Sequence, residues 1–241
     1  AAAVDKHVAV LGDLQGPKIR IERFAGGRAI LAEGEPFALD RLEAYQVRQV
    51  LVAALSAVSV LGLIACDPNK PQFVSIDITG AEYARGFQLP DQNGQMRSLE
   101  EFKGKVVAVF FGYTQCPDVC PTTLTEWVEI KRQLGADGDR LQGIFITVDP
   151  ARDTPEVLKA YMGNFDPSFL ALIPGSPEAL AQVAKEYKII YKKVDGKTPG
   201  SYTMDHSAGS YLYDPQGRLR LYSRYGNRVD GLVTDIKQLL R

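Results

Sequence analysis

Two cysteines four positions apart, Cys116 and Cys120, carry the most reactive side chains of this sequence. They lie in the segment 112–121, directly after the apolar run 106–111, where an α/β sheet places its functional loops. A helix that starts here offers free N–H groups and the positive end of its dipole, so we expect lowered pKa values for both thiols. The spacing puts both sulfurs on one side of about one helical turn, where they can bind a metal ion or form a disulfide.

One histidine is placed to join them. The chain has two histidines, His7 and His206, and only His206 precedes a predicted strand of the same sheet, 210–213. Two thiolates and an imidazole suit Cu(I) and also accommodate Cu(II), whereas Zn(II) with an open position is the alternative. We predict His206 as the third ligand; taken alone, it would be interpreted as a hydrogen-bonded loop histidine. We assign no role to His7.

Alternating strands and helices must position these residues, and they predict an α/β sheet covered on both faces. Continuous apolar runs at 106–111 and 141–148 are typical of strands buried on both sides. The helix between them shows an apolar stripe at three- and four-residue spacing. Its members are Leu124, Trp127, Ile130 and Leu134.

The remaining elements follow from caps and turns. Thr154-Pro155 and Ser176-Pro177 each predict a helix start, with the hydroxyl as N-cap and proline in the first turn. Val157 and Leu158 are expected on the apolar face of the first of these helices. Asp230 is expected to cap the last helix. Two hairpins are predicted, one around Asn93-Gly94 and one at 211–222.

Five motifs of this region together resemble the Sco (SenC) family over about residues 86–241. They are Phe110–Thr114, Cys116–Pro121, Val148–Pro150, Arg152–Pro155 and Asp205–Ala208. The resemblance implies a thioredoxin-like fold with an N-terminal hairpin, and one copper bound by Cys116, Cys120 and His206. It also implies a role in assembling the binuclear copper site of cytochrome c oxidase subunit II, with periplasmic copper chaperones or thioredoxin-like reductases as further partners.

Neighbouring residues receive supporting roles. Asp149 and Asp153 are interpreted as turn and cap residues rather than ligands. Asp205 is expected to orient the imidazole, and Met204 is expected to pack rather than bind metal. Three further residues are expected to shape and pack the site: Tyr113, Trp127 and Pro117.

Three functions fit the cysteines. The leading interpretation is a copper metallochaperone, which is a binding protein rather than a turnover enzyme. The alternative is a thiol–disulfide oxidoreductase in which Cys116 attacks a disulfide and Cys120 resolves it, although general thioredoxins use a two-residue gap. A structural disulfide without metal is the third, since the predicted compartment is oxidising.

The start of the chain belongs to other segments. Residues 1–41 resemble a pyruvate kinase fragment in Val10–Arg20 and Glu33–Asp40, too short for a barrel of about 250 residues. Residues 42–66 read as a signal peptide or membrane anchor whose Leu63–Cys66 resembles a lipobox, with lipidation expected at Cys66. Because an export signal belongs at an N-terminus, we hypothesise that translation starts near Val47, at a GTG codon.

A linker leading into the domain, residues 67–85, would then hold the folded part outside the cell inner membrane, facing the periplasm or outer side. The net charge of −1 predicts no attraction to nucleic acid. Three cysteines are too few for a fold stabilised by disulfides, so the domain must be stabilised by its hydrophobic core.

Overall fold

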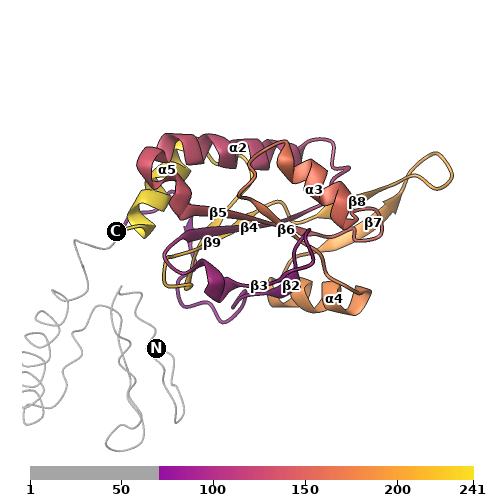
Figure 1. Cartoon of the computed structure of the whole chain (residues 1–241), viewed down its shortest axis with the longest axis horizontal. Coiled ribbons are helices and arrows are strands. Elements are labelled where there is room, and N and C mark those ends of the chain that lie inside the picture. Colours follow the sequence, from indigo (N-terminus) through magenta and orange to yellow (C-terminus); the bar gives the residue numbers. More distant parts are fainter. Residues whose placement is uncertain (1–70) are drawn as a thin grey trace, which may run out of the picture. The chain divides into compact units, whose positions relative to one another are not determined.

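A six-stranded mixed sheet organises residues 71–241, the part of the chain that the computed structural model describes (Figure 1). The predictions made for residues 1–66, including lipidation at Cys66, lie outside the described residues. Within 71–241, no helix combines the length and the apolar character needed to cross a membrane. Across the sheet the strands are β1 (Ile76–Asp77), β10 (Leu219–Ser223), β9 (Ser210–Tyr213), β4 (Val106–Gly112), β5 (Leu141–Thr147) and β6 (Leu170–Leu172).

The centre of the sheet is parallel and completely buried. β4 pairs with β5 in parallel, from Val106 opposite Leu141 to Gly112 opposite Thr147, and every residue of both strands is buried. Successive side chains point to opposite faces: Phe110 meets Trp127 at a centroid separation of 6.4 Å, whereas Phe111 meets Tyr187 at 5.0 Å. This explains the uninterrupted apolar runs and confirms the predicted sheet covered on both faces.

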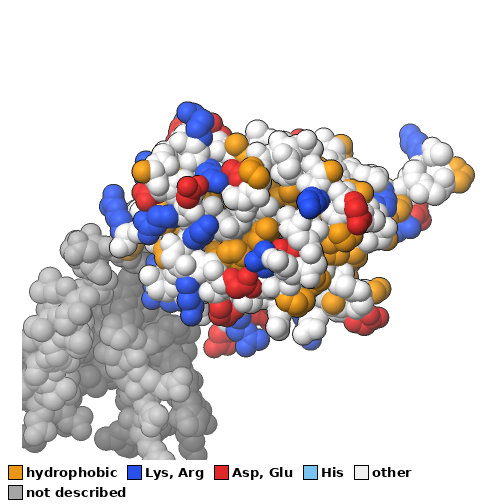
Figure 2. All heavy atoms as spheres, in the orientation of Figure 1, with side chains coloured by type: hydrophobic (Ala, Val, Ile, Leu, Met, Phe, Trp, Pro, Cys, Tyr) orange, Lys and Arg blue, Asp and Glu red, His pale blue; other side chains and the backbone are white. Residues whose placement is uncertain are grey.

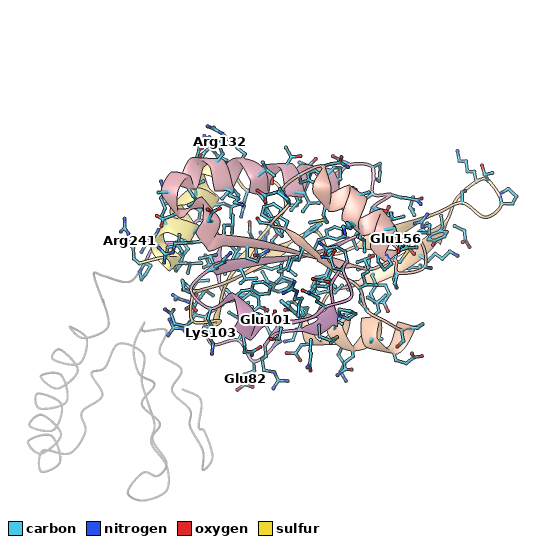
Figure 3. All side chains as sticks on the ribbon, viewed as in Figure 1. Glu82, Glu101, Lys103, Arg132, Glu156 and Arg241 are labelled. Carbon is cyan, nitrogen blue, oxygen red and sulfur yellow. The ribbon has the colours of Figure 1, made fainter. Side chains whose placement is uncertain are left out.

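Helices cover the two faces unequally. Figure 1 shows α2, α3 and α5 on one side and α4 with the β2–β3 hairpin on the other. The bounds are α2 (Val119–Leu134), α3 (Pro155–Gly163), α4 (Pro177–Glu186), α5 (Val229–Leu239), β2 (Gln88–Pro90) and β3 (Met96–Ser98), with short 3₁₀ helices η1 (Leu99–Phe102) and η2 (Gly135–Arg140). The labelled charged side chains, such as Arg132 and Glu156, extend outward from these layers in Figure 3.

The predicted helix starts at threonine and serine are confirmed. Thr154 Oγ1 accepts a hydrogen bond from Val157 N, and Ser176 Oγ accepts one from Ala179 N. Each hydroxyl satisfies a backbone donor that the first helical turn leaves free.

Aspartates organise the two predicted hairpin turns. Asp91 accepts bonds from Asn93 N and Gln95 N, and Asp214 accepts them from Gln216 N and Arg218 N. Both carboxylates are also buried and paired with arginine. Each turn is therefore closed by a side chain at its first position, in addition to its glycine.

Two helix predictions are wrong. Arg228, not Asp230, is the N-cap of α5, because the helix begins two residues earlier than predicted. Asp230 lies in the first turn and pairs with Arg228 at 3.3 Å. Val157 is 41% exposed. The short α3 buries only Leu158 and Met162, which are four positions apart and share one face.

Four strands were not predicted: β6, β1 within the predicted linker, and the two strands of a projecting hairpin. The hairpin consists of β7 (Tyr191–Asp195) and β8 (Tyr202–His206), which pair only with each other. Most of its residues are exposed, and Figure 2 shows it extending from the body with basic and hydrophobic side chains. It contains the predicted ligand His206, so it bears directly on function.

A buried aspartate of the last helix binds the start of the folded domain. The buried Asp235 of α5 accepts hydrogen bonds from Val74 N and Ser75 N, both at 2.8 Å.

Asp235→Ala would leave two N–H donors without this acceptor, so we expect a loss of about 2–4 kcal/mol in the free energy of unfolding. Urea unfolding measures this. Asp230→Ala, an exposed carboxylate on the same helix, should cost less than about 1 kcal/mol; equal losses in both variants would contradict the role given to Asp235.

Candidate metal centre

The cysteine loop leaves the C-terminal end of β4 and enters α2. Cys116 precedes the helix and is half-buried, whereas Cys120 is its second residue and is fully buried. Asp118 is the N-cap but makes no capping hydrogen bond with its side chain. The backbone N–H groups of Asp118 and Cys120 face the sulfur of Cys116, as expected for a thiolate at a helix N-terminus.

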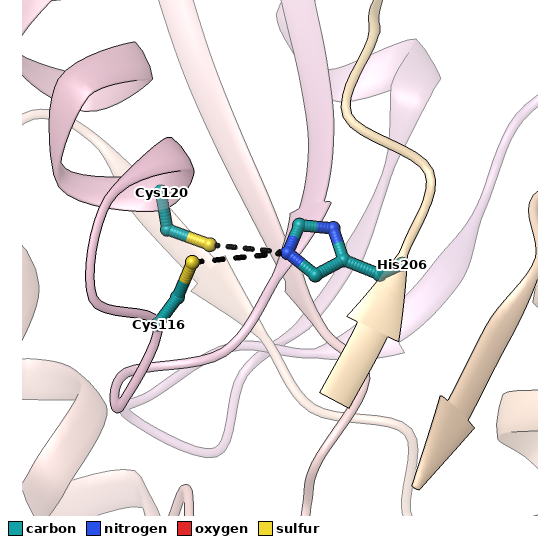
Figure 4. Close-up of side chains that lie close together, drawn as sticks. All are labelled: Cys116, Cys120 and His206. Carbon is teal, nitrogen blue, oxygen red and sulfur yellow. Dashed lines mark hydrogen bonds between the residues drawn. The ribbon is translucent and has the colours of Figure 1, made fainter. Parts of the chain in front are cut away.

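His206 reaches this loop from the other side. It is the last residue of β8, and its Nε2 lies 3.9 Å from Sγ of Cys116 and 3.5 Å from Sγ of Cys120 (Figure 4). All three donor atoms lie within 4.8 Å of one another. The structure thus brings together the three predicted residues, which are separated by up to 90 positions.

The surroundings of the imidazole differ from the prediction. Nδ1 lies 3.0 Å from the carbonyl oxygen of Ser207, and Asp205 is exposed, so the expected role of Asp205 is wrong. Strand alternation explains this, because neighbouring residues of β8 point to opposite sides. A carbonyl bonded to Nδ1–H leaves Nε2 unprotonated and free to bind a metal ion.

Aromatic rings fix the orientation of the imidazole. Phe110 and Tyr113 approach it edge-on with centroid separations of 5.9 and 5.8 Å. Met204 is buried, as predicted. Trp127 packs against Phe110 and so supports the site from one layer below.

Pro117 does not pack as predicted. It is exposed in the turn between the two cysteines. The loop is solvent-facing at this point, which leaves the side of the site near Cys116 open.

Gly112 permits the close approach of Cys120. A Cβ atom at this position would lie 2.6 Å from Sγ of Cys120 and 2.8 Å from the ring of Phe145. Both distances are shorter than carbon contacts in packed proteins. The absence of a side chain at Gly112 is therefore what seats the buried sulfur against the end of β4.

Asp153 secures the start of the cysteine loop, and its role was not predicted correctly. It is fully buried and does not cap α3; it accepts bonds from N and Oγ1 of Thr114 and from Oγ1 of Thr147. Burial raises the pKa of Asp153, and the hydroxyl and amide donors act against that rise. The signal that the sequence analysis missed is a threonine at the C-terminal end of each buried parallel strand: Thr114 just after β4 and Thr147 as the last residue of β5.

Asp149 is confirmed as a turn residue. Its carbonyl oxygen accepts from the N–H groups of Arg152 and Asp153, and its carboxylate pairs with the Arg152 guanidinium. The carboxylate also accepts a bond from the Tyr202 hydroxyl of β8. Asp149 therefore contacts the histidine hairpin without approaching the metal donors.

The two thiols have opposite acidities. The thiol of Cys120 beside it, together with the backbone N–H groups of Asp118 and Cys120, lowers the pKa of Cys116 to about 4 against the cost of burial. The same neighbouring sulfur and burial raise the pKa of Cys120 well above its usual range. The prediction that both values are lowered is therefore wrong for Cys120, because two adjacent thiols retain one proton between them.

The donor geometry suits a small, soft metal ion. With bonds of about 2.0 Å to nitrogen and about 2.3 Å to sulfur, and angles of about 110–120°, nitrogen and sulfur donors lie about 3.5–3.7 Å apart. The observed nitrogen–sulfur separations are 3.5 and 3.9 Å. Hard cations prefer oxygen ligands, so the chemistry of the donors and their spacing both favour Cu(I) or Zn(II).

Comparison with known proteins assigns the family. The SCO1/SenC family model matches residues 77–241. The chain belongs to the SCO1/SenC family. The SCO2-like protein of Rickettsia felis is 35% identical over 174 residues, which cover 70% of this chain and 84% of that protein.

Solved SCO1/SenC structures share the fold. ScoI of Bradyrhizobium japonicum with copper bound is 44% identical, with a TM-score of 0.58, and covers 64% of this chain and 97% of its own. Yeast Sco1 with copper bound is 34% identical, with a TM-score of 0.57, covering 64% and 85%. These matches confirm the predicted thioredoxin-like α/β fold for this SCO1/SenC domain.

The difference in acidity between the thiols predicts selective alkylation. Iodoacetamide should modify Cys116 of the reduced, metal-free protein at neutral pH, and the rate should fall as pH decreases through about 4, where this thiolate becomes protonated. Cys120 should remain unmodified. Mass spectrometry of peptides after short exposures measures both rates.

Cys120→Ala removes the neighbouring thiol, which is the largest cause of the lowered pKa of Cys116. The pH at which the alkylation rate of Cys116 is half-maximal should therefore rise toward the usual thiol pKa of about 8.5. A midpoint near 8.5 in the unaltered protein would contradict the assigned acidities.

Proposed function

We propose that this chain binds one copper ion through Sγ of Cys116, Sγ of Cys120 and Nε2 of His206. The contact of one imidazole nitrogen with both sulfurs, at 3.9 and 3.5 Å, carries this proposal. Relatives whose structures hold copper support it. Two thiolates and one imidazole select a soft ion and leave coordination positions open.

The cargo would leave by ligand exchange. Cys116 is half-buried and precedes the helix, and Pro117 beside it is exposed. A thiolate of a partner protein can therefore approach from this side, displace Cys116 and then displace the deeper Cys120. Each step replaces one copper–sulfur bond with another, and the released cysteine takes up a proton if its acidity requires one.

The resemblance of the motifs supports a proposal for the acceptor. We propose cytochrome c oxidase subunit II, whose binuclear copper site contains cysteines, with other periplasmic copper chaperones as donors. We also propose that the domain faces the periplasm or outer side of the cell inner membrane. This localisation rests on the anchor-like segment 42–66 and the lipobox ending at Cys66.

Thiol–disulfide exchange is the second candidate, and the acidity of Cys116 favours it. The Cys116 thiolate would attack a partner disulfide and release one partner thiolate. Cys120, after losing its proton, would attack the mixed disulfide and release the second thiolate. The partner gains two electrons and the cysteine pair becomes a disulfide. Thioredoxin-like reductases would then restore the thiols.

A copper titration of the reduced protein distinguishes the two functions. The unaltered chain should bind one copper ion, and His206→Ala should weaken binding by more than about 10-fold, because even loss of an outer-sphere partner costs that much. Reduction of a model disulfide by the same variant should continue, since both cysteines remain. Unchanged copper affinity in His206→Ala would refute the three-donor site.

A further inference from the structure

The guanidinium of Arg152 connects the two halves of the metal centre, which are the cysteine loop and the β7–β8 hairpin that carries His206. Arg152 Nη1 donates to Oε1 of Gln115, the residue before Cys116, and to the carbonyl oxygen of Tyr202 in β8, both at 2.9 Å. Its Nε pairs with the carboxylate of Asp149. Arg152 follows β5 and belongs to neither half, so it links the cysteine loop and the histidine hairpin through a third part of the fold.

Aromatic stacking strengthens the link to the hairpin. The guanidinium carbon of Arg152 lies 3.5 Å from the ring centroid of Tyr202 and 5.7 Å from that of Tyr113. The hydroxyl of Tyr202 donates to Asp149 at 2.9 Å. Tyr202 is thus held by its ring, its hydroxyl and its carbonyl, all through the ion pair of Arg152 and Asp149.

The hairpin needs such a contact because strand pairing does not hold it. β7 and β8 form a separate two-stranded sheet, while the cysteine loop continues from the central sheet. Isolated two-stranded hairpins are marginally stable in water. The distance between the imidazole and the sulfurs therefore depends on side-chain contacts such as those of Arg152.

Arg152 is largely buried, and one of its donors has no partner among the described residues. Its side chain is 19% exposed and its partner Asp149 is 5% exposed. Nη2 is buried and has no hydrogen-bond partner among the described residues. Unpaired buried donors are rare in native proteins, so a group that keeps one is a candidate for a functional role.

We infer that Arg152 is a positioning residue that holds the β7–β8 hairpin so that His206 stays within ligand distance of Cys116 and Cys120. This inference rests on the proposed copper function for its binding readout. Lysine cannot replace Arg152 in this role. One ammonium nitrogen cannot pair with Asp149 as Nε does, donate to Gln115 and Tyr202 as Nη1 does, and also stack flat on the Tyr202 ring.

The test is a double-mutant cycle on the full chain, with copper affinity as the readout. Arg152→Lys should weaken copper binding about 10-fold, the size typical of groups that orient a ligand. In the His206→Ala background the same change should alter the copper affinity by a factor close to one, because there is no imidazole left to position. An equal factor in both backgrounds, or no effect in the unaltered background, would overturn the inference.

Arg220→Lys is the matched control. Arg220 is 20% exposed, pairs with the buried Asp214 and lies 5.9 Å from the ring of Phe73, but it contacts neither half of the metal centre. Its replacement should leave copper affinity unchanged. A loss equal to that of Arg152→Lys would show general destabilisation and count against the inference.

Hydrogen exchange gives a readout that needs no metal. Amides of residues 191–206 should exchange faster in metal-free Arg152→Lys than in Arg220→Lys, because the hairpin is released only in the first variant. Equal exchange in the two variants would overturn the inference. If the unaltered chain bound no copper, the proposed function would fail, while this comparison would still decide the role of Arg152.

Discussion

The contact between the His206 imidazole and two sulfurs crosses the C-terminal edge of the central sheet, and the other features of the site depend on it. The cysteines reach this edge through β4, a strand buried on both faces. The histidine reaches it through a hairpin that pairs only with itself. A rigid half and a lightly held half therefore meet at the donors, so their separation is set by side chains rather than by the sheet.

Buried polar groups hold the rigid half in place. Asp153 binds the loop at Thr114 and the end of β5 at Thr147, and Gly112 lets the Cys120 sulfur settle against β4. Partially satisfied polar networks cost stability, but satisfied ones specify a single geometry. The preorganised sulfurs then share one proton, which makes the half-buried Cys116 the thiolate and the buried Cys120 the thiol.

Most of the central fold follows from local patterns. The apolar runs of β4 and β5 and the caps at Thr154 and Ser176 have direct physical causes that one sequence reveals. The β7–β8 hairpin does not, because its exposed residues, among them Lys192 and Lys193, show no apolar alternation. β6 is only three residues long, and Asp230 resembled a cap because aspartate is favoured both at that position and in the first turn.

The site divides in the same way. Cys116 and Cys120 are predictable from their spacing after a buried strand, and His206 from its motif and from the scarcity of histidine. The supporting contacts of Asp153, Gly112 and Arg152 arise from residues that meet only in three dimensions. The opposite acidities of the two thiols likewise depend on how each sulfur lies beside the other and on the burial of Cys120, which spacing alone does not disclose.

X-ray absorption at the copper edge of the reduced, copper-loaded chain tests the central claim most directly. Two sulfur neighbours at about 2.3 Å and one nitrogen at about 2.0 Å are predicted, by analogy with the bond lengths of other borderline-soft ions. A shell with sulfur neighbours only, or with nitrogen and oxygen neighbours only, would contradict the three-donor centre.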